Sequence, residues 1–288
     1  MPTQLKINQK LALGTVQFGL NYGISNIYGK TNKNEVGRIL EFAWANGIKT
    51  IDTAGDYGNS EEVLGKQMNH PFEIITKLSI HKKDIAEIKI SLDESLKKLN
   101  VENLYALLVH DAENLITNKE IWGALLAFKA KGVIKKIGYS LYYPYQLEQL
   151  IDLNMVPDII QIPYNIIDNR FKSWLIELKK INCEIHSRSV FLQGLFFRKP
   201  EDLPNHFNEI KPLLKKLHEQ FIDIEKLAAW LLLEVIKERN IDKVVFGVNN
   251  LEQLQNNLFN IAHPPAFKLE SNYFMPDKIL IPNLWNNE

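Results

Sequence analysis

The sequence has a single cysteine, no excess of charge of either sign, and no apolar run long enough to cross a bilayer. Cys183 therefore has no intramolecular partner, which fits a reducing compartment. Lys and Arg number 34 and Asp and Glu number 34, so no overall basic field attracts nucleic acid or anionic lipid. The most apolar run, 227–236, is too short to span a membrane, and residues 1–10 lack the apolar core of a signal peptide. We expect a cytoplasmic protein that binds neither membrane nor nucleic acid; the oligomeric state is left open.

A linker rich in Pro, Gly or Ser is also missing, so nothing in the 288 residues marks a domain boundary. Short apolar runs alternate instead with helical patterns, which is typical of a parallel sheet. The first strand is followed by GTVQFG, which lacks the glycine spacing of a dinucleotide-binding open sheet. We therefore predict a single-domain α/β protein, a (β/α)8 TIM barrel over residues 1–288 with a C-terminal tail from about residue 263. The expected strands are 11–15, 49–53, 73–77, 105–110, 135–140, 158–162, 183–187 and 243–247.

Some connections carry signals of their own. Asn32 with Glu35, and Thr117 with Glu120, resemble capping boxes that begin helices. The connection 195–221 is unusually long for a barrel and contains a helical stretch at 211–219. Long loops of barrels are often functional.

Four polar residues are expected at the carboxyl ends of successive strands, where barrel enzymes carry their active sites. Tyrosine, lysine, aspartate and histidine together suit carbonyl reduction, in which the oxygen that receives negative charge needs a proton. The lysine would lower the pKa of the tyrosine, and the aspartate would hold the lysine. The histidine would hydrogen-bond the substrate oxygen. The four candidates are Tyr57, Lys77, Asp52 and His110.

Each candidate has another interpretation. Asp52 could cap a turn, Tyr57 could be an ordinary loop aromatic, and His110 could be a histidine at the barrel rim. Lys77 at a strand end is also compatible with a Schiff-base aldolase. The seven histidines show no metal-binding spacing, so no metal site is expected.

The segment IDTAGDYGNSEEVLGK closely resembles the signature D-T-A-x-x-Y-G-x-S-E-x-x-L-G of the aldo-keto reductases. ITKL and LLVHD resemble the strands that carry the lysine and the histidine of that family, and the resemblance runs from about Leu11 to Ile261. It implies that Asp52, Tyr57, Lys77 and His110 form a catalytic tetrad. It also implies a nicotinamide cofactor bound across the barrel mouth.

The same resemblance implies which residues bind that cofactor. Ser140 and Gln161 match carboxamide-binding positions, and Arg188 stands where the family often stacks an aromatic ring on the nicotinamide. The string FGVNNLEQLQNNL matches the segment that binds pyrophosphate and adenosine. NADP(H) is expected rather than NAD(H), although Asn249 replaces an arginine that the family commonly uses for the 2′-phosphate. The expected contacts in this segment are Gly247, Asn249, Gln253 and Asn257.

We therefore expect an NAD(P)H-dependent oxidoreductase that reduces a small aldehyde or ketone. Tyr142, Tyr143 and Tyr145 offer ring surfaces suited to a sugar, which makes a sugar-derived carbonyl the favoured substrate. Aromatic and aliphatic aldehydes remain open. The alternatives are a cofactor-binding regulatory protein of the same family and, less favoured, the aldolase.

Overall fold

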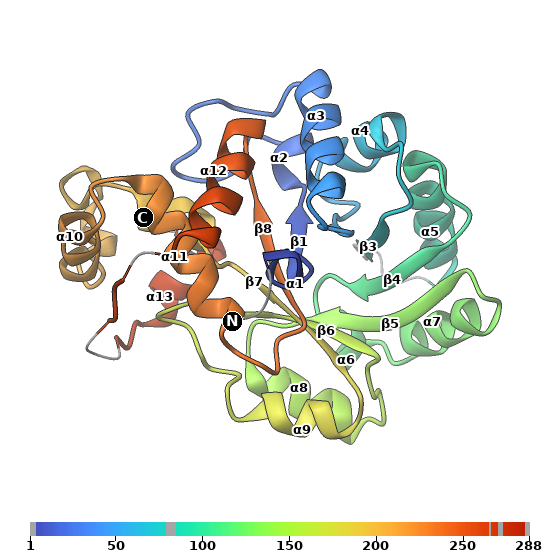
Figure 1. The fold of residues 1–288 in the computed structure, drawn as a ribbon. Helices are drawn as coiled ribbons and strands as arrows, with labels where there is room; N and C mark the ends of the chain where they lie inside the picture. Colours follow the sequence, from blue (N-terminus) through green and yellow to red (C-terminus); the bar gives the residue numbers. More distant parts are fainter. Residues whose placement is uncertain (1–3, 79–84, 265, 270–272, 286–288) are drawn as a thin grey trace.

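Eight parallel strands close into a barrel in the order of the chain (Figure 1). The computed structural model describes residues 4–78, 85–264, 266–269 and 273–285. All eight expected strands are present, which confirms the predicted (β/α)8 barrel. The strands are β1 (Leu11–Gly14), β2 (Thr50–Asp52), β3 (Glu73–Leu78), β4 (Leu104–Val109), β5 (Ile134–Ser140), β6 (Ile159–Pro163), β7 (Glu184–Arg188) and β8 (Lys243–Gly247).

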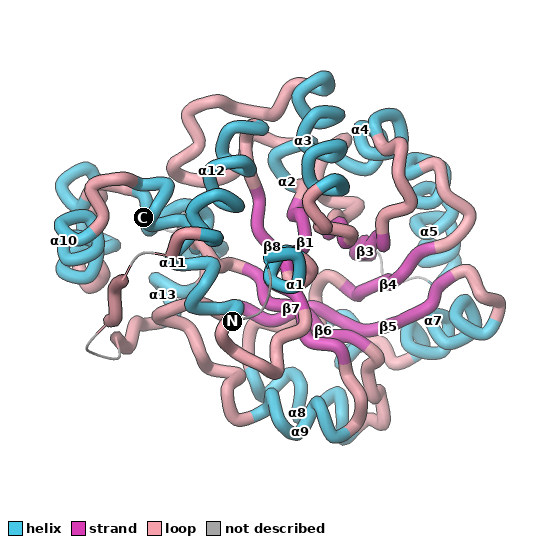
Figure 2. Tube along the Cα trace, viewed as in Figure 1, coloured by secondary structure: helices cyan, strands magenta, loops and turns pink. Residues whose placement is uncertain are grey.

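The strands lie in the centre of the molecule and the helices surround them (Figure 2). Within the described residues, no helix combines the length and the apolar character needed to cross a membrane. The helices are α1 (Gln4–Asn8), α2 (Val16–Gly19), α3 (Lys33–Ala45), α4 (Ser60–Gln67), α5 (Ile85–Leu99), α6 (Glu113–Thr117), α7 (Glu120–Ala130), α8 (Pro144–Asp152), α9 (Trp174–Lys180), α10 (Lys211–Gln220), α11 (Ile224–Ile236), α12 (Leu251–Ala262) and α13 (Asp277–Leu280).

Strand register decides which side chains meet at the mouth of the barrel. Gly14 of β1 pairs with Asp52 of β2 and with Gly247 of β8. Ser140 of β5 pairs with Gln161 of β6. Because parallel strands end at the same rim, residues distant in sequence are brought to one place.

Two predicted helix starts differ in detail from the structure. Asn32 accepts a hydrogen bond from the Asn34 amide at 2.9 Å, but Glu35 accepts from the amide of Leu251 instead of completing the box. The prediction for Thr117 was wrong, because this residue ends α6 and its hydroxyl donates back to the Glu113 carbonyl.

The long connection after β7 and the C-terminal tail pack against each other. The helix of the long connection, α10, covers the helical stretch predicted at 211–219. It lies beside α13 at one side of the barrel, at the left in Figure 1. The apolar side chains of α10 and α13 belong to one buried cluster, separate from the main core. Three short 3₁₀ helices, η1 (Leu192–Phe197), η2 (Pro200–Asp202) and η3 (Asn205–Phe207), complete the connection, and η4 (Pro282–Leu284) follows α13.

Candidate active site

A cavity of about 690 Å³ opens where the strands end. It extends from the ends of β2 and β4 to the start of α12. Every site residue predicted from the sequence lines it except Lys77, which lies beneath its floor. The predicted residues in its wall are Asp52, Tyr57, His110, Ser140, Gln161, Arg188, Gly247, Asn249, Gln253 and Asn257.

Lys77 and Asp52 form a buried ion pair, with both residues at most 2% exposed. The Lys77 Nζ donates to Asp52 Oδ1 at 2.6 Å and to the Thr53 carbonyl at 2.9 Å. Gln161 Nε2 donates to the other carboxylate oxygen of Asp52 at 2.7 Å. Burial lowers the pKa of Lys77, while the charge of Asp52 raises it. The lysine is therefore held in one position by a network that also uses the amide of Gln161.

Two glycines position the backbone of Tyr57. A Cβ added to Gly19 would lie 1.7 Å from the Tyr57 carbonyl oxygen, so only glycine allows α2 to approach this closely. Gly58 has a φ of +59°, a left-handed conformation that glycine adopts without strain. The Tyr57 carbonyl then accepts from the amide of Ser60 at 3.0 Å, at the start of α4. Gly58, directly after Tyr57, thus helps to fix the backbone position of the tyrosine.

The Tyr57 ring is close to both the buried lysine and the histidine. Lys77 Nζ is 5.1 Å from the Tyr57 ring centroid, and the His110 ring meets Tyr57 edge to face at 5.9 Å. His110 Nδ1 is 3.5 Å from Asp56 Oδ2, a carboxylate that the sequence analysis did not single out. The four predicted residues are therefore brought together in one cluster.

The pKa of Tyr57 shifts in the direction opposite to the prediction. Burial raises it above its ordinary value, the nearby charge of Asp52 raises it further, and Arg188 acts the other way. Burial of the hydroxyl is the largest cause, and the lysine charge that could oppose it is already paired with Asp52 at 2.6 Å.

Arg188 is fixed against an aromatic ring at the end of β7. Its guanidinium donates to the Leu141 carbonyl at 3.0 Å and to Ser189 Oγ at 3.2 Å, and lies 4.2 Å from the Tyr142 ring centroid. Tyr22 also lines the cavity, and burial raises the pKa of its hydroxyl. Tyr22 lies in the loop between α2 and α3, at the start of the segment 22–30 that the sequence suggests as a substrate loop.

The far end of the cavity holds polar atoms without partners. Gln17 Oε1 and Asn249 Oδ1 are buried there, and neither has a hydrogen-bond partner. A Cβ on Gly247 would lie 2.5 Å from Gln17 Oε1, so the glycine is needed for the amide to fit. Buried polar atoms normally have partners, so this part of the cavity suits a polar, extended ligand.

The chain is similar to known proteins in sequence and in fold. The model of the family described as "Aldo/keto reductase family" matches residues 10–267. The chain is 25% identical over 281 residues to the 6-dehydroglucose reductase of Agrobacterium fabrum, covering 88% of this chain and 90% of that protein. It is 28% identical over 172 residues to the glyoxal reductase of Bacillus subtilis, covering 57% and 60%. Its fold is similar to that of an aldo-keto reductase from Bacillus halodurans in its holo form, with a TM-score of 0.71, 20% identity, and coverage of 90% of this chain and 88% of that one.

Proposed function

The chain belongs to the aldo/keto reductase family, and we propose that it uses NAD(P)H to reduce a small aldehyde or ketone to an alcohol. The observation that carries the proposal is the buried Lys77–Asp52 pair close to the Tyr57 ring, with His110 in edge-to-face contact with the same ring. Family membership supports an oxidoreductase in general. The roles of the individual residues are our proposal.

In this mechanism Tyr57 is the general acid. A bound nicotinamide would supply the hydride for the carbonyl carbon, so negative charge would grow on the substrate oxygen. The Tyr57 phenol, kept protonated by burial, donates its proton to that oxygen. The Lys77 ammonium, 5.1 Å from the ring centroid, then stabilises the tyrosinate that remains. His110 hydrogen-bonds the carbonyl oxygen and directs its approach.

Asp52 acts through the lysine. Its carboxylate opposes the fall in the Lys77 pKa that burial causes, so the ammonium stays charged. The same carboxylate raises the pKa of Tyr57, which favours the protonated donor at the start of each turnover. Asp52 therefore favours the protonated phenol before the reaction, and Lys77 stabilises the tyrosinate that the reaction leaves.

The residues around the cavity fit an extended dinucleotide. Arg188 would hold the nicotinamide, and Ser140 and Gln161, which pair in register, would bind its carboxamide. Because Gln161 Nε2 already donates to Asp52, its carbonyl oxygen is the group left for the carboxamide. NADP(H), which the family resemblance favours, and NAD(H) carry the same nicotinamide, so this mechanism holds for either. The pyrophosphate and adenosine would lie along Gly247, Asn249, Gln253 and Asn257.

The contacts of Lys77 disfavour the aldolase. A Schiff base needs a neutral and accessible amine, whereas Lys77 is 1% exposed and paired with Asp52. We expect borohydride to trap no carbonyl compound on this lysine. Mass spectrometry of the treated protein checks this, and a substrate adduct on Lys77 would contradict our assignment.

We propose a sugar-derived carbonyl as the substrate class. Tyr142 lines the cavity, and so do the polar side chains of Tyr22, Asp56 and Gln193. Tyr143 and Tyr145 stack on each other instead, with ring centroids 5.4 Å apart. The Agrobacterium relative named as a 6-dehydroglucose reductase supports the same class.

A fluorescence titration followed by a substrate panel tests the proposed function. We expect the protein to bind a reduced nicotinamide dinucleotide, and to oxidise it faster with sugar-derived carbonyls than with simple alkyl aldehydes. Brisk reduction of alkyl aldehydes alone would remove the sugar proposal and leave the reductase. Cofactor binding without turnover on any carbonyl would instead indicate the regulatory protein.

A further inference from the structure

One carboxylate, Glu225, lines the cavity near α12, and another, Glu35, binds the first amide of that helix, where a 2′-phosphate would require cations. We propose that the chain prefers NAD(H) to NADP(H), the reverse of the preference that the family resemblance implies. This inference rests on the proposed function, because it assumes that a dinucleotide binds along β8 and α12. The two cofactors differ only in the phosphate on the adenosine ribose, so the residues around that ribose decide the choice.

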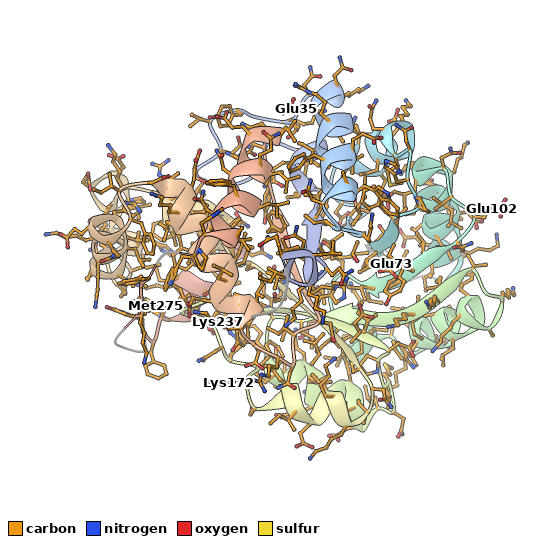
Figure 3. All side chains as sticks on the ribbon, in the orientation of Figure 1. Glu35, Glu73, Glu102, Lys172, Lys237 and Met275 are labelled. Carbon is orange, nitrogen blue, oxygen red and sulfur yellow. The ribbon has the colours of Figure 1, made fainter. Side chains whose placement is uncertain are left out.

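The first amides of α12 already have an anionic partner. Helix N-termini attract phosphate because their amides point outward and the helix dipole favours negative charge. In this chain the amide of Leu251 donates to Glu35 Oε1 at 2.6 Å. Glu35 belongs to the neighbouring helix α3, where Figure 3 labels it. The amide of Gln253 donates to Asn250 Oδ1 at 2.9 Å. The Glu35 carboxylate therefore already occupies the Leu251 amide, which could otherwise donate to a phosphate.

Arg38 and Arg188 each already have partners within the chain. Arg38 pairs with the second oxygen of Glu35, and its side chain is 67% exposed. Of the lysines and arginines in the described parts of the chain, Arg188 alone lines the cavity. Arg188 lies at the end of β7, held against Tyr142 and the Leu141 carbonyl. A 2′-phosphate beside α12 would thus meet the Glu35–Arg38 pair, and it would gain a cation only if Arg38 left Glu35.

Acceptor groups face the same region. Glu225, at the start of α11, lines the cavity, and Asn256 of α12 donates to its Oε1 at 2.6 Å. Asn249, which replaces the arginine common in the family, contributes a buried oxygen without a partner. A ribose hydroxyl can donate a hydrogen bond to a carboxylate or an amide oxygen, as in many NAD sites. A phosphate dianion would be repelled by the same groups.

Titration of the purified full-length protein with NADH and with NADPH tests the inference. We expect the Kd for NADH to be lower by at least about tenfold at physiological ionic strength. Equal or tighter binding of NADPH would overturn the preference but leave the proposed function intact. Binding of neither cofactor would contradict the proposed function itself.

Two variants locate the cause of the preference. Glu35→Gln keeps an acceptor for the Leu251 amide but removes the charge, so NADPH should gain about three- to tenfold in affinity relative to NADH. Glu252→Gln is the matched control, because Glu252 is an exposed carboxylate in the first turn of the same helix. It should leave the ratio nearly unchanged.

Asn249→Arg places a cation at the position of the unpartnered amide, and should improve NADPH binding by about tenfold. If Glu35→Gln changes the ratio no more than Glu252→Gln, and Asn249→Arg does not change it either, the assignment to these residues is wrong.

Discussion

Replacing Tyr57 with phenylalanine is expected to lower kcat for carbonyl reduction by about 100- to 10,000-fold. The substitution removes one hydroxyl and leaves the ring, its contact with His110 and the glycine-dependent backbone in place. Because the lost group acts only when charge develops on the substrate oxygen, the Kd for cofactor should change less than about twofold. Stopped-flow measurement of cofactor oxidation, with a fluorescence titration, gives both quantities.

Tyr139→Phe is the matched control for this substitution. The hydroxyl of Tyr139 is buried and donates to the Met155 carbonyl at 3.2 Å, away from the cavity. This variant should lose some stability and keep its reductase activity. If the Tyr57 variant retained turnover close to that of the wild type, the proton would have to come from another group.

Lys77→Met is expected to abolish most of the activity and also to destabilise the fold. The variant leaves Asp52 buried with only Gln161 as a hydrogen-bond donor, and breaking one side of a buried ion pair costs about 3–5 kcal/mol. The uncompensated carboxylate would raise the pKa of Tyr57 further, and the tyrosinate would lose its neighbouring cation. Urea unfolding measures the stability, and cofactor oxidation measures the activity.

A double variant separates the two effects. Lys77→Met combined with Asp52→Asn removes the buried charge while keeping an acceptor for Gln161, so it should recover most of the lost stability. It should remain inactive, because no cation supports the tyrosinate. Recovery of activity together with stability would show that the ion pair acts only in folding.

The sequence was sufficient for the barrel because each strand is a short, buried apolar run between amphipathic helices. The family motifs that contain Asp52, Tyr57, Lys77 and His110 were sufficient to predict that these residues meet at one rim of the barrel, because parallel strands end at the same rim. The direction of the Tyr57 pKa was not predictable in this way. It depends on how closely Asp52 approaches Lys77 and on the desolvation of the ring, which are properties of packing.

Contacts between distant segments explain the other differences. Glu35 was predicted to complete a capping box at its own helix, but the fold places α12 beside it, and the amide of Leu251 takes its carboxylate. Nothing near residue 35 in the sequence indicates a partner 216 positions away. The cofactor preference inferred from this contact likewise needed the three-dimensional structure.

The central claim is that this cavity transfers hydride to a carbonyl carbon while Tyr57 supplies the proton. Single-turnover reduction with a cofactor deuterated at the transferred position tests it most directly. We expect one deuterium on the former carbonyl carbon of the alcohol, formed rapidly by the wild type and slowed by at least about 100-fold in Tyr57→Phe. Alcohol without deuterium, or equal rates in the two proteins, would contradict it.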